Sequence, residues 1–197
     1  MQSIENKAIS RIYGHGRGWC FSQTDFSDLG PRGSIDSALH RLERQSTIRR
    51  ITRGLYEYPR YSNLLNTVIG PDMEEAARAL ARKFKWEIIP NGSTALYILG
   101  VSTQVPSRYV YISSGPNRIF NILGVELVFW HQETRQTIFQ YAESALVVQA
   151  MRSMGKNNIT SEIMSRIRER FDEQKWKRII KDTASVASWI HDEIKRW

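Results

Sequence analysis

Residues 33–59 read GSIDSALHRLERQSTIRRITRGLYEYP, and this stretch decides the fold that we predict for the N-terminal part of the chain. Apolar side chains recur in it at helical spacing, at Ile35, Ala38, Leu39 and Leu42. This spacing predicts a helix with one buried face. An arginine-rich hairpin is predicted over residues 47–58, with Arg53-Gly54 as its turn. A helix followed at once by a basic hairpin is the order in which a winged helix-turn-helix presents its DNA-binding elements.

The residues before this stretch complete the same module. Ser3–Tyr13 carries apolar residues on one helical face, and Trp19–Phe21 is predicted to be a short strand. Ser22 is a suitable N-cap for a brief helix that ends near Leu29. Gly30-Pro31 then turns the chain into the basic helix. We therefore predict a winged helix-turn-helix DNA-binding domain over residues 1–61.

The polar face of the basic helix and the hairpin supply the candidate DNA contacts. The residues predicted to read bases are Arg32, Ser34, Ser37 and Arg41. The residues predicted to hold phosphates are Arg44, Arg49, Arg50 and Arg53. The guanidinium fork can meet O6 and N7 of guanine together, which distinguishes bases, whereas phosphate contacts set affinity and register.

The charge balance supports a polyanionic partner. The chain has a formal net charge of +8, and residues 1–61 hold ten Lys or Arg against six Asp or Glu. Such a balance favours nucleic acid, because binding to phosphates releases condensed counterions. Scattered arginines can also form a merely solvated face, and winged domains can bind proteins. The position of the arginines on the helix and hairpin favours operator DNA, with a protein-interaction module as the alternative.

The rest of the chain predicts a mixed domain, so that the whole protein is α+β. Residues 61–71 are expected to form a linker, and residues 70–197 an α+β domain that ends in helices. Apolar positions from Trp176 to Trp197 alternate spacings of four and three, which predicts one final helix. This seam could join two copies into a homodimer, but we favour packing on the domain's own core, because three heptads are few for a coiled coil.

Motifs for catalysis, metals and cofactors are missing, so we expect no enzyme, no metal and no cofactor. Asn91-Gly92-Ser93 could hold a phosphate at a helix start, but nucleotidyl transfer also needs clustered carboxylates, and no Asp lies between Asp72 and Asp172. We interpret these residues as a helix N-cap. The single Cys20 excludes an internal disulfide, and no apolar run is long enough for a membrane span. The expected location is the cytoplasm, with no membrane partner.

Three stretches carry a family resemblance over about residues 3–154. They are RGLYEYP (Arg53–Pro59), NGSTALYILG (Asn91–Gly100) and STQVPSRYVYISSGP (Ser102–Pro116). In them the chain resembles abortive-infection type IV toxin–antitoxin antitoxins of the AbiEi kind. The resemblance implies a winged helix that represses its own operon, with DNA contacts from the Arg32–Arg44 helix and the Arg49–Arg53 hairpin. It also implies a C-terminal domain that neutralises a co-encoded nucleotidyltransferase-like toxin, and it brings no catalytic motif.

Overall fold

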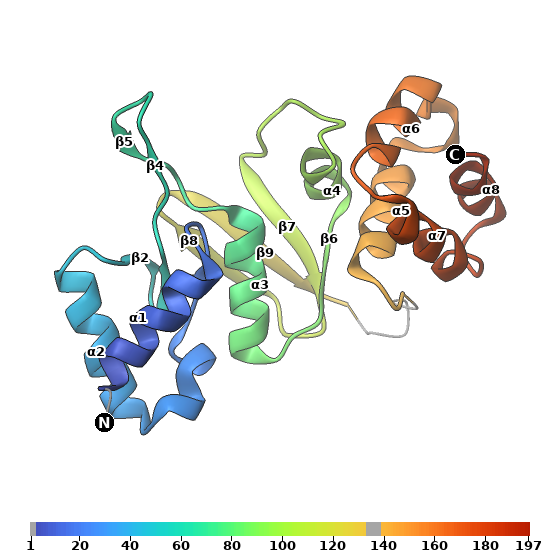
Figure 1. Ribbon diagram of the computed structural model, residues 1–197. Coiled ribbons are helices and arrows are strands. Elements are labelled where there is room, and N and C mark those ends of the chain that lie inside the picture. The colour runs from blue at the N-terminus through green and yellow to red at the C-terminus, as the bar shows by residue number, and fades with distance from the viewer. Residues whose placement is uncertain (1–2, 133–138) are drawn as a thin grey trace. The chain divides into compact units, whose positions relative to one another are not determined.

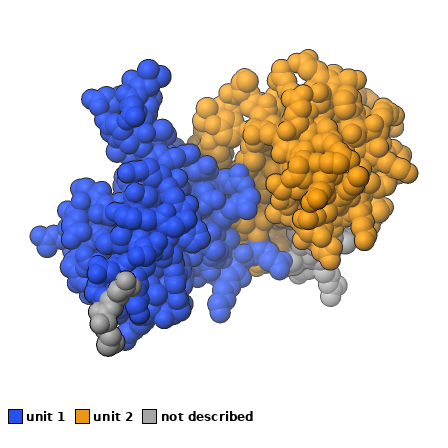
Figure 2. Space-filling model, viewed as in Figure 1, with its two compact units in different colours: residues 1–87, 119–127 blue, residues 88–118, 128–197 orange. Residues whose placement is uncertain are grey.

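The protein is an α+β structure that divides into two compact units (Figure 2). The computed structural model describes residues 3–132 and 139–197. Unit 1 comprises residues 1–87 and 119–127, and unit 2 comprises residues 88–118 and 128–197. Each unit is described through its own elements.

Unit 1 begins with the predicted order of helices and strands (Figure 1). Its first elements are α1 (Ile4–His15), β1 (Cys20–Phe21), the 3-10 helix η1 (Gln23–Leu29), α2 (Arg32–Arg44), β2 (Arg49–Thr52) and β3 (Leu55–Glu57). The three strands form an antiparallel sheet in the order β1-β3-β2. β2 and β3 form a tight hairpin, and β1 pairs with the other edge of β3. β3 is therefore the central strand. The predicted helix, hairpin and turn are confirmed.

Local sequence explains where these elements start. The Ser3 hydroxyl accepts a hydrogen bond from the Asn6 amide and caps α1. The Asp25 carboxylate accepts one from the Ser22 amide at 2.8 Å and so closes a capping box on η1. The core then forms from the apolar faces of the helices and the sheet: Ala8, Ile12, Phe21, Phe26, Ile35, Leu39, Leu42 and Ile48. The residues predicted as the buried stripe of α2 are all buried.

The segment predicted as a linker contains a second hairpin. β4 (Tyr61–Ser62) and β5 (Thr67–Val68) pair in antiparallel fashion. The linker prediction was incomplete because both strands have only two residues, too few for a period-2 pattern to stand out. Hydrogen bonding closes the base of this hairpin, where the Ile69 amide donates to the Arg60 carbonyl at 2.9 Å.

Helix α3 (Met73–Phe84) belongs to unit 1, whereas the sequence placed it in the second domain, 70–197. Its buried face is rich in alanine, which lets the helix approach β1 and η1 closely. At its C-terminal end Arg82 donates to the Cys20 carbonyl at 2.7 Å and to Asp25 at 3.0 Å. Unit 1 is therefore larger than the predicted domain 1–61, because these contacts attach α3 to it.

Four strands form the second main sheet. They are β6 (Ile88–Pro90), β7 (Arg108–Ser113), β8 (Arg118–Ile122) and β9 (Val125–His131), in the order β6-β7-β9-β8. β8 and β9 are consecutive in the chain and pair as a hairpin through Gly124. Leu123 and Gly124 at its turn both have positive φ.

The helices of unit 2 enclose its core. They are α4 (Gly92–Ile98), α5 (Ala142–Met154), the 3-10 helix η3 (Lys156–Asn158), α6 (Ser161–Arg168), α7 (Glu173–Asp182) and α8 (Ser188–Arg196). The Asn91 side chain accepts from the Gly92 amide at 2.7 Å, so the N-cap interpretation of this motif is confirmed. The core contains apolar residues of α4, α5, α6, α7 and α8.

The single final helix predicted from Trp176 to Trp197 was wrong, because the chain forms α7 and α8 with a turn between them. The buried Thr183 hydroxyl donates to the Ile179 carbonyl at 2.8 Å, and the Val186 amide donates to the Thr183 carbonyl. Thr, Ser and Val are weak helix formers, and they follow one another closely here. Trp176 and Ile194 of the seam are buried in the unit 2 core, which confirms core packing.

Gly92 allows α4 to approach α5. A Cβ at this position would clash with the Cβ and Oγ of Ser153, while the Ser153 Cα would be at 3.5 Å. We therefore expect Gly92→Ala to lower the free energy of unfolding by about 1–3 kcal/mol, the usual cost of overpacking. Urea denaturation measures the free energy of unfolding of the wild type, Gly92→Ala, Ser153→Gly and the double variant, which form a double-mutant cycle. The penalty of Gly92→Ala should be small in the background that carries Ser153→Gly, and an equal penalty in both backgrounds would contradict the explanation.

Candidate nucleic-acid interface

Helix α2 separates its side chains into two faces. Ile35, Ala38, Leu39 and Leu42 are at most 1 % exposed. The opposite face is exposed along much of the helix and carries the polar residues Arg32, Ser34, Ser37, Arg41 and Arg44. An exposed polar face over a buried apolar one is the arrangement that a recognition helix needs to enter the major groove while its domain stays folded.

Three of the four predicted base-reading residues lie together. Ser34, Ser37 and Arg41 line one open hollow of about 410 Å³. Ile4 and Gly33 complete its lining, so α1 also contributes to this surface. The Ser37 hydroxyl donates to the Gly33 carbonyl at 2.8 Å, a bond within the helix that a nucleic-acid contact can replace.

Arg41 is held in place by α1. Its Nε donates to Glu5 Oε2 at 2.6 Å, although its side chain remains 53 % exposed. Glu5 was not among the predicted residues, because a contact across 36 positions leaves no local pattern. An exposed ion pair of this kind contributes little to stability, so Arg41 can exchange Glu5 for another acceptor at small cost.

Arg32 and Arg44 are located at the two ends of α2. The Arg32 side chain is 80 % exposed, and its ion pair with Asp36 is long, at 3.7 Å. Arg44 lies in the last turn. Neither residue lines the hollow that Ser34, Ser37 and Arg41 share. The structure therefore brings together three of the predicted contacts on α2 and leaves these two arginines apart from them.

The β2–β3 hairpin exposes two of its three predicted phosphate contacts. Arg50 and Arg53 are exposed, and the Arg50 Nε is 3.4 Å from the Thr52 carbonyl. Gly54 adopts a φ of 70°, which the tight turn requires. Lys83 of α3 donates to the Gly54 carbonyl at 3.0 Å and approaches the Arg53 carbonyl. These contacts hold the turn against α3.

Arg49 differs from the other two hairpin arginines because it is engaged inside unit 1. It forms an ion pair with Glu57, whose side chain is only 2 % exposed, and it donates to the Ile69 carbonyl at 2.9 Å. Burial raises the pKa of Glu57, and the Arg49 charge acts in the opposite direction. The structure therefore places Arg49 in a structural role, which differs from the predicted phosphate contact.

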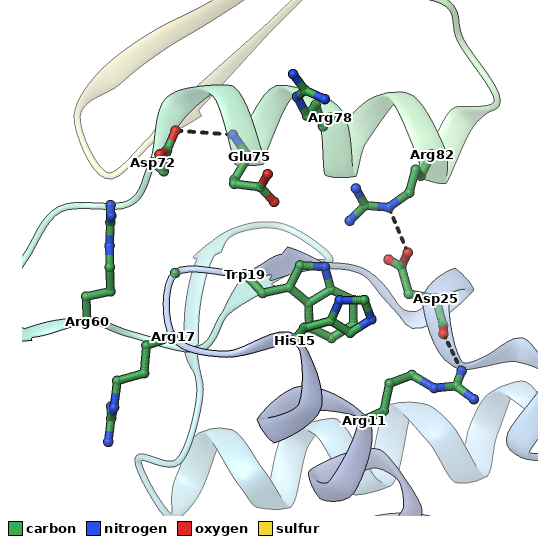
Figure 3. Close-up of a pocket in the computed structure, with 11 residues that line it drawn as sticks. Arg11, His15, Arg17, Trp19, Asp25, Arg60, Asp72, Glu75, Arg78 and Arg82 are labelled. Carbon is green, nitrogen blue, oxygen red and sulfur yellow. Dashed lines mark hydrogen bonds and ion pairs between the residues drawn. The ribbon is translucent and has the colours of Figure 1, made fainter. Parts of the chain in front are cut away.

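A larger pocket of about 820 Å³ also lies in unit 1 (Figure 3). Most of the charged side chains that line it contact other residues of unit 1. Arg11 contacts both oxygens of Asp28 at 2.6 Å, and Arg82 contacts Asp25 at 3.0 Å. The Arg11 hydrogen bond holds the pKa of Asp28 down, at about 2. These pairs join α1, η1 and α3, and we interpret the pocket as the surface of a structural charge network.

His15 and Trp19 stack in the same pocket, with ring centroids 3.9 Å apart (Figure 3). Trp19 also contacts Phe21, so the pair extends the aromatic core to the surface. Cys20, next to Trp19, is fully buried, and this burial raises the pKa of its thiol. Cys20 is therefore a core residue of unit 1.

Residues 3–132 and 139–197 contain neither a group of side chains suited to a metal ion nor a helix suited to a membrane span. No group of three or more His, Cys, Asp or Glu residues there could hold a metal ion. None of the helices described there has the length and apolar character needed to cross a membrane.

Comparison with protein families matches residues 7–179 to a family described as "Family of unknown function (DUF6088)". The chain belongs to DUF6088. The DUF6088 match begins inside α1 and ends inside α7, so it includes α2, the β2–β3 and β4–β5 hairpins and most of unit 2. The comparison with curated proteins gives no match.

Proposed function

We propose that this DUF6088 protein binds DNA in a sequence-specific manner through α2 and the β2–β3 turn. The observation that carries the proposal is the exposed polar face of α2, from which Ser34, Ser37 and Arg41 surround one hollow. Serine hydroxyls and guanidinium groups are donors that suit base edges in the major groove. No catalytic arrangement is part of the proposal, which describes a binding protein.

The proposed DNA contacts form two groups according to their position in unit 1. Arg32, Ser34, Ser37 and Arg41 are proposed to face base edges. Arg44, Arg50 and Arg53 are cations at the end of α2 and at the hairpin, and we propose that they hold phosphates. Arg49 is omitted from this set, because its Nη2 is engaged by Glu57 and by the Ile69 carbonyl within unit 1.

The proposed biological role is repression by an antitoxin. The support is the resemblance of Arg53–Pro59, Asn91–Gly100 and Ser102–Pro116 to antitoxins of the AbiEi kind. In this role the winged module represses its own operon, and the rest of the chain counteracts a co-encoded nucleotidyltransferase-like toxin. A toxin gene beside this one, whose toxicity disappears on co-expression, is the expected result. A neighbouring gene product that is equally toxic with and without this protein would exclude the antitoxin role.

A binding titration tests the DNA proposal directly. The protein is titrated by fluorescence anisotropy against its own upstream DNA and against a scrambled duplex, at two salt concentrations. We expect the upstream DNA to bind at least about 10³-fold more tightly at physiological salt. Equal affinities that fall steeply with salt would show only a basic surface, and would leave the protein-interaction alternative for α2.

Two single substitutions separate base reading from phosphate binding. Arg41→Ala should weaken binding to the operator more than to random DNA, by about 1–3 kcal/mol, because a base contact is lost. Arg50→Ala should weaken both equally and reduce the slope of log K against log salt by about one. If both variants lose the same factor on both duplexes, this division of roles is wrong.

A further inference from the structure

Helix α1 holds Arg41 of α2 by one nitrogen of its guanidinium and leaves the other two nitrogens accessible. The two helices pack against each other in the core of unit 1 (Figure 1). Arg41 Nε donates to Glu5 Oε2 at 2.6 Å. Among the residues that the structure describes, neither Nη1 nor Nη2 of Arg41 has a hydrogen-bond partner. The N–H groups on these two nitrogens therefore remain available to a ligand.

Glu5 is suited to give Arg41 a defined direction. Its side chain is only 21 % exposed, so the carboxylate is the more covered partner of this ion pair. Glu5 lies in the first turn of α1, which the Ser3 hydroxyl caps, and this cap orders the backbone that carries it. An arginine that is ordered before DNA arrives loses less side-chain entropy on binding.

Arg32 of the same helix has a weaker support. Its ion pair is with Asp36 of α2 itself, at 3.7 Å, and both side chains are exposed, by 80 % and 52 %. An exposed pair of this kind within one helix contributes little and leaves both side chains mobile. Arg41, whose partner comes from a second helix at 2.6 Å, has the better-defined direction.

The accessible end of the Arg41 guanidinium matches one base edge. Nη1 and Nη2 present N–H donors side by side, and guanine offers two neighbouring acceptors, O6 and N7, in the major groove. Adenine places an amino donor beside its N7, cytosine presents an amino donor, and thymine has a methyl group beside O4, so none of them accepts both N–H groups. The hollow that Arg41 shares with Ser34 and Ser37 is open at this point.

The carboxylate also makes Arg41 a poor contact for phosphate. Glu5 places a negative charge 2.6 Å from Arg41 Nε, and a DNA phosphate bound to the same guanidinium would be repelled by it. Guanine O6 and N7 carry only partial charges, so they are repelled less. The Glu5–Arg41 pair therefore favours a base edge over the DNA backbone.

We propose that Glu5 is a positioning residue, which directs Arg41 to the O6 and N7 atoms of a guanine. Glu5 acts by holding Nε and does not itself touch the DNA. This inference rests on the proposed DNA binding by α2. It adds the base that Arg41 reads and a residue outside α2 that determines specificity.

Replacement of the guanines of the upstream duplex, one at a time, by 7-deazaguanine tests the proposal. This base lacks N7 but keeps its Watson–Crick pairing. In anisotropy titrations of the full chain, one such replacement should weaken wild-type binding roughly 10-fold, and Arg41→Ala should abolish this penalty. Glu5→Ala keeps Arg41 but should reduce the penalty to about threefold or less, because the guanidinium is no longer directed. Glu5→Gln keeps a side-chain oxygen that accepts from Nε, so it should retain most of the penalty.

Two controls separate positioning from charge and from folding. Glu162→Ala removes an ion pair with Arg166 at 2.7 Å in unit 2, changes the net charge equally, and should keep the full penalty. Both Glu5 variants should bind scrambled DNA at least as tightly as the wild type, because an anion near the phosphates is removed. Such binding shows that these variants are folded.

Three results would overturn the inference. They are a full 7-deazaguanine penalty in Glu5→Ala, a penalty that Glu5→Gln loses as completely as Glu5→Ala, and a duplex in which no guanine replacement is sensed through Arg41. A wild type that binds upstream and scrambled DNA equally is a different result. It would reject the proposed function itself, and the inference with it.

Discussion

Replacing Arg49 with methionine should lower the free energy of unfolding by roughly 3 kcal/mol, the usual result of removing one partner from a buried ion pair. Methionine keeps much of the length and packing of the side chain but leaves the Glu57 carboxylate, 2 % exposed, without its cation. The bond to the Ile69 carbonyl is lost as well, so β5 should also loosen. Urea denaturation measures the total change, and hydrogen exchange of peptides from β2, β3 and β5 locates it.

The stability that Arg49→Met loses relative to the wild type should depend on pH in a defined direction. Burial already raises the pKa of Glu57, and removal of the Arg49 charge raises it further. A carboxyl whose folded-state pKa lies above its unfolded value contributes stability below the unfolded pKa, and this contribution is lost as pH rises through the folded pKa. The deficit of Arg49→Met relative to the wild type should therefore shrink as the pH is lowered from about 7 to about 4.5.

A double variant provides the control for this result. Arg49→Met/Glu57→Gln removes both charges together, and it should be more stable than Arg49→Met at neutral pH, because no uncompensated carboxylate remains buried. If the double variant is less stable than the single one, or if the deficit of Arg49→Met is independent of pH, the buried charge is not the cause.

Charge reversal at the hairpin should have the largest effect on DNA binding. Arg50→Glu/Arg53→Glu replaces two exposed cations with anions, and we expect affinity for the upstream duplex to fall roughly 100-fold or more at moderate salt. The cause is loss of two phosphate contacts together with repulsion of the backbone. Stability should stay within about 0.5 kcal/mol of the wild type, as for other surface substitutions.

The matched control for charge reversal lies in unit 2. Arg152→Glu/Lys156→Glu changes the net charge by the same amount at exposed positions outside unit 1. It should reduce DNA binding much less, since it leaves the hairpin intact. Equal losses in the two variants would mean that net charge alone attracts DNA. Undiminished toxin neutralisation by Arg50→Glu/Arg53→Glu would separate the antitoxin activity from DNA binding.

Much of unit 1 is predictable from sequence because its signals are local. Ile35, Ala38, Leu39 and Leu42 repeat with the helical period, and Arg53-Gly54 lies between two strands. Each of these signals acts within a few residues, so it does not require knowledge of the tertiary contacts. The β4–β5 hairpin and the break between α7 and α8 were missed, because two-residue strands and a Thr183 turn leave almost no periodic signal.

The candidate site was predictable only as a set of residue types. The exposed positions on α2 follow from its buried stripe, and the structure places Ser34, Ser37 and Arg41 around a common hollow. The long-range partners of the arginines were not predictable. Arg41 contacts Glu5 and Arg49 contacts the Ile69 carbonyl, over separations that no local pattern encodes, whereas Glu57 is the cross-strand neighbour of Arg49 in the β2–β3 hairpin.

The sequence by itself determined the α+β character, the two-faced helix α2 and the basic hairpin after it, because periodicity and turn chemistry are properties of neighbouring residues. Tertiary structure alone decided that α3 belongs to unit 1 and that Arg49 donates to the Ile69 carbonyl. It also decided that Leu64 and Leu65 are exposed. The physical reason is that burial and ion pairing depend on which distant side chains meet in space.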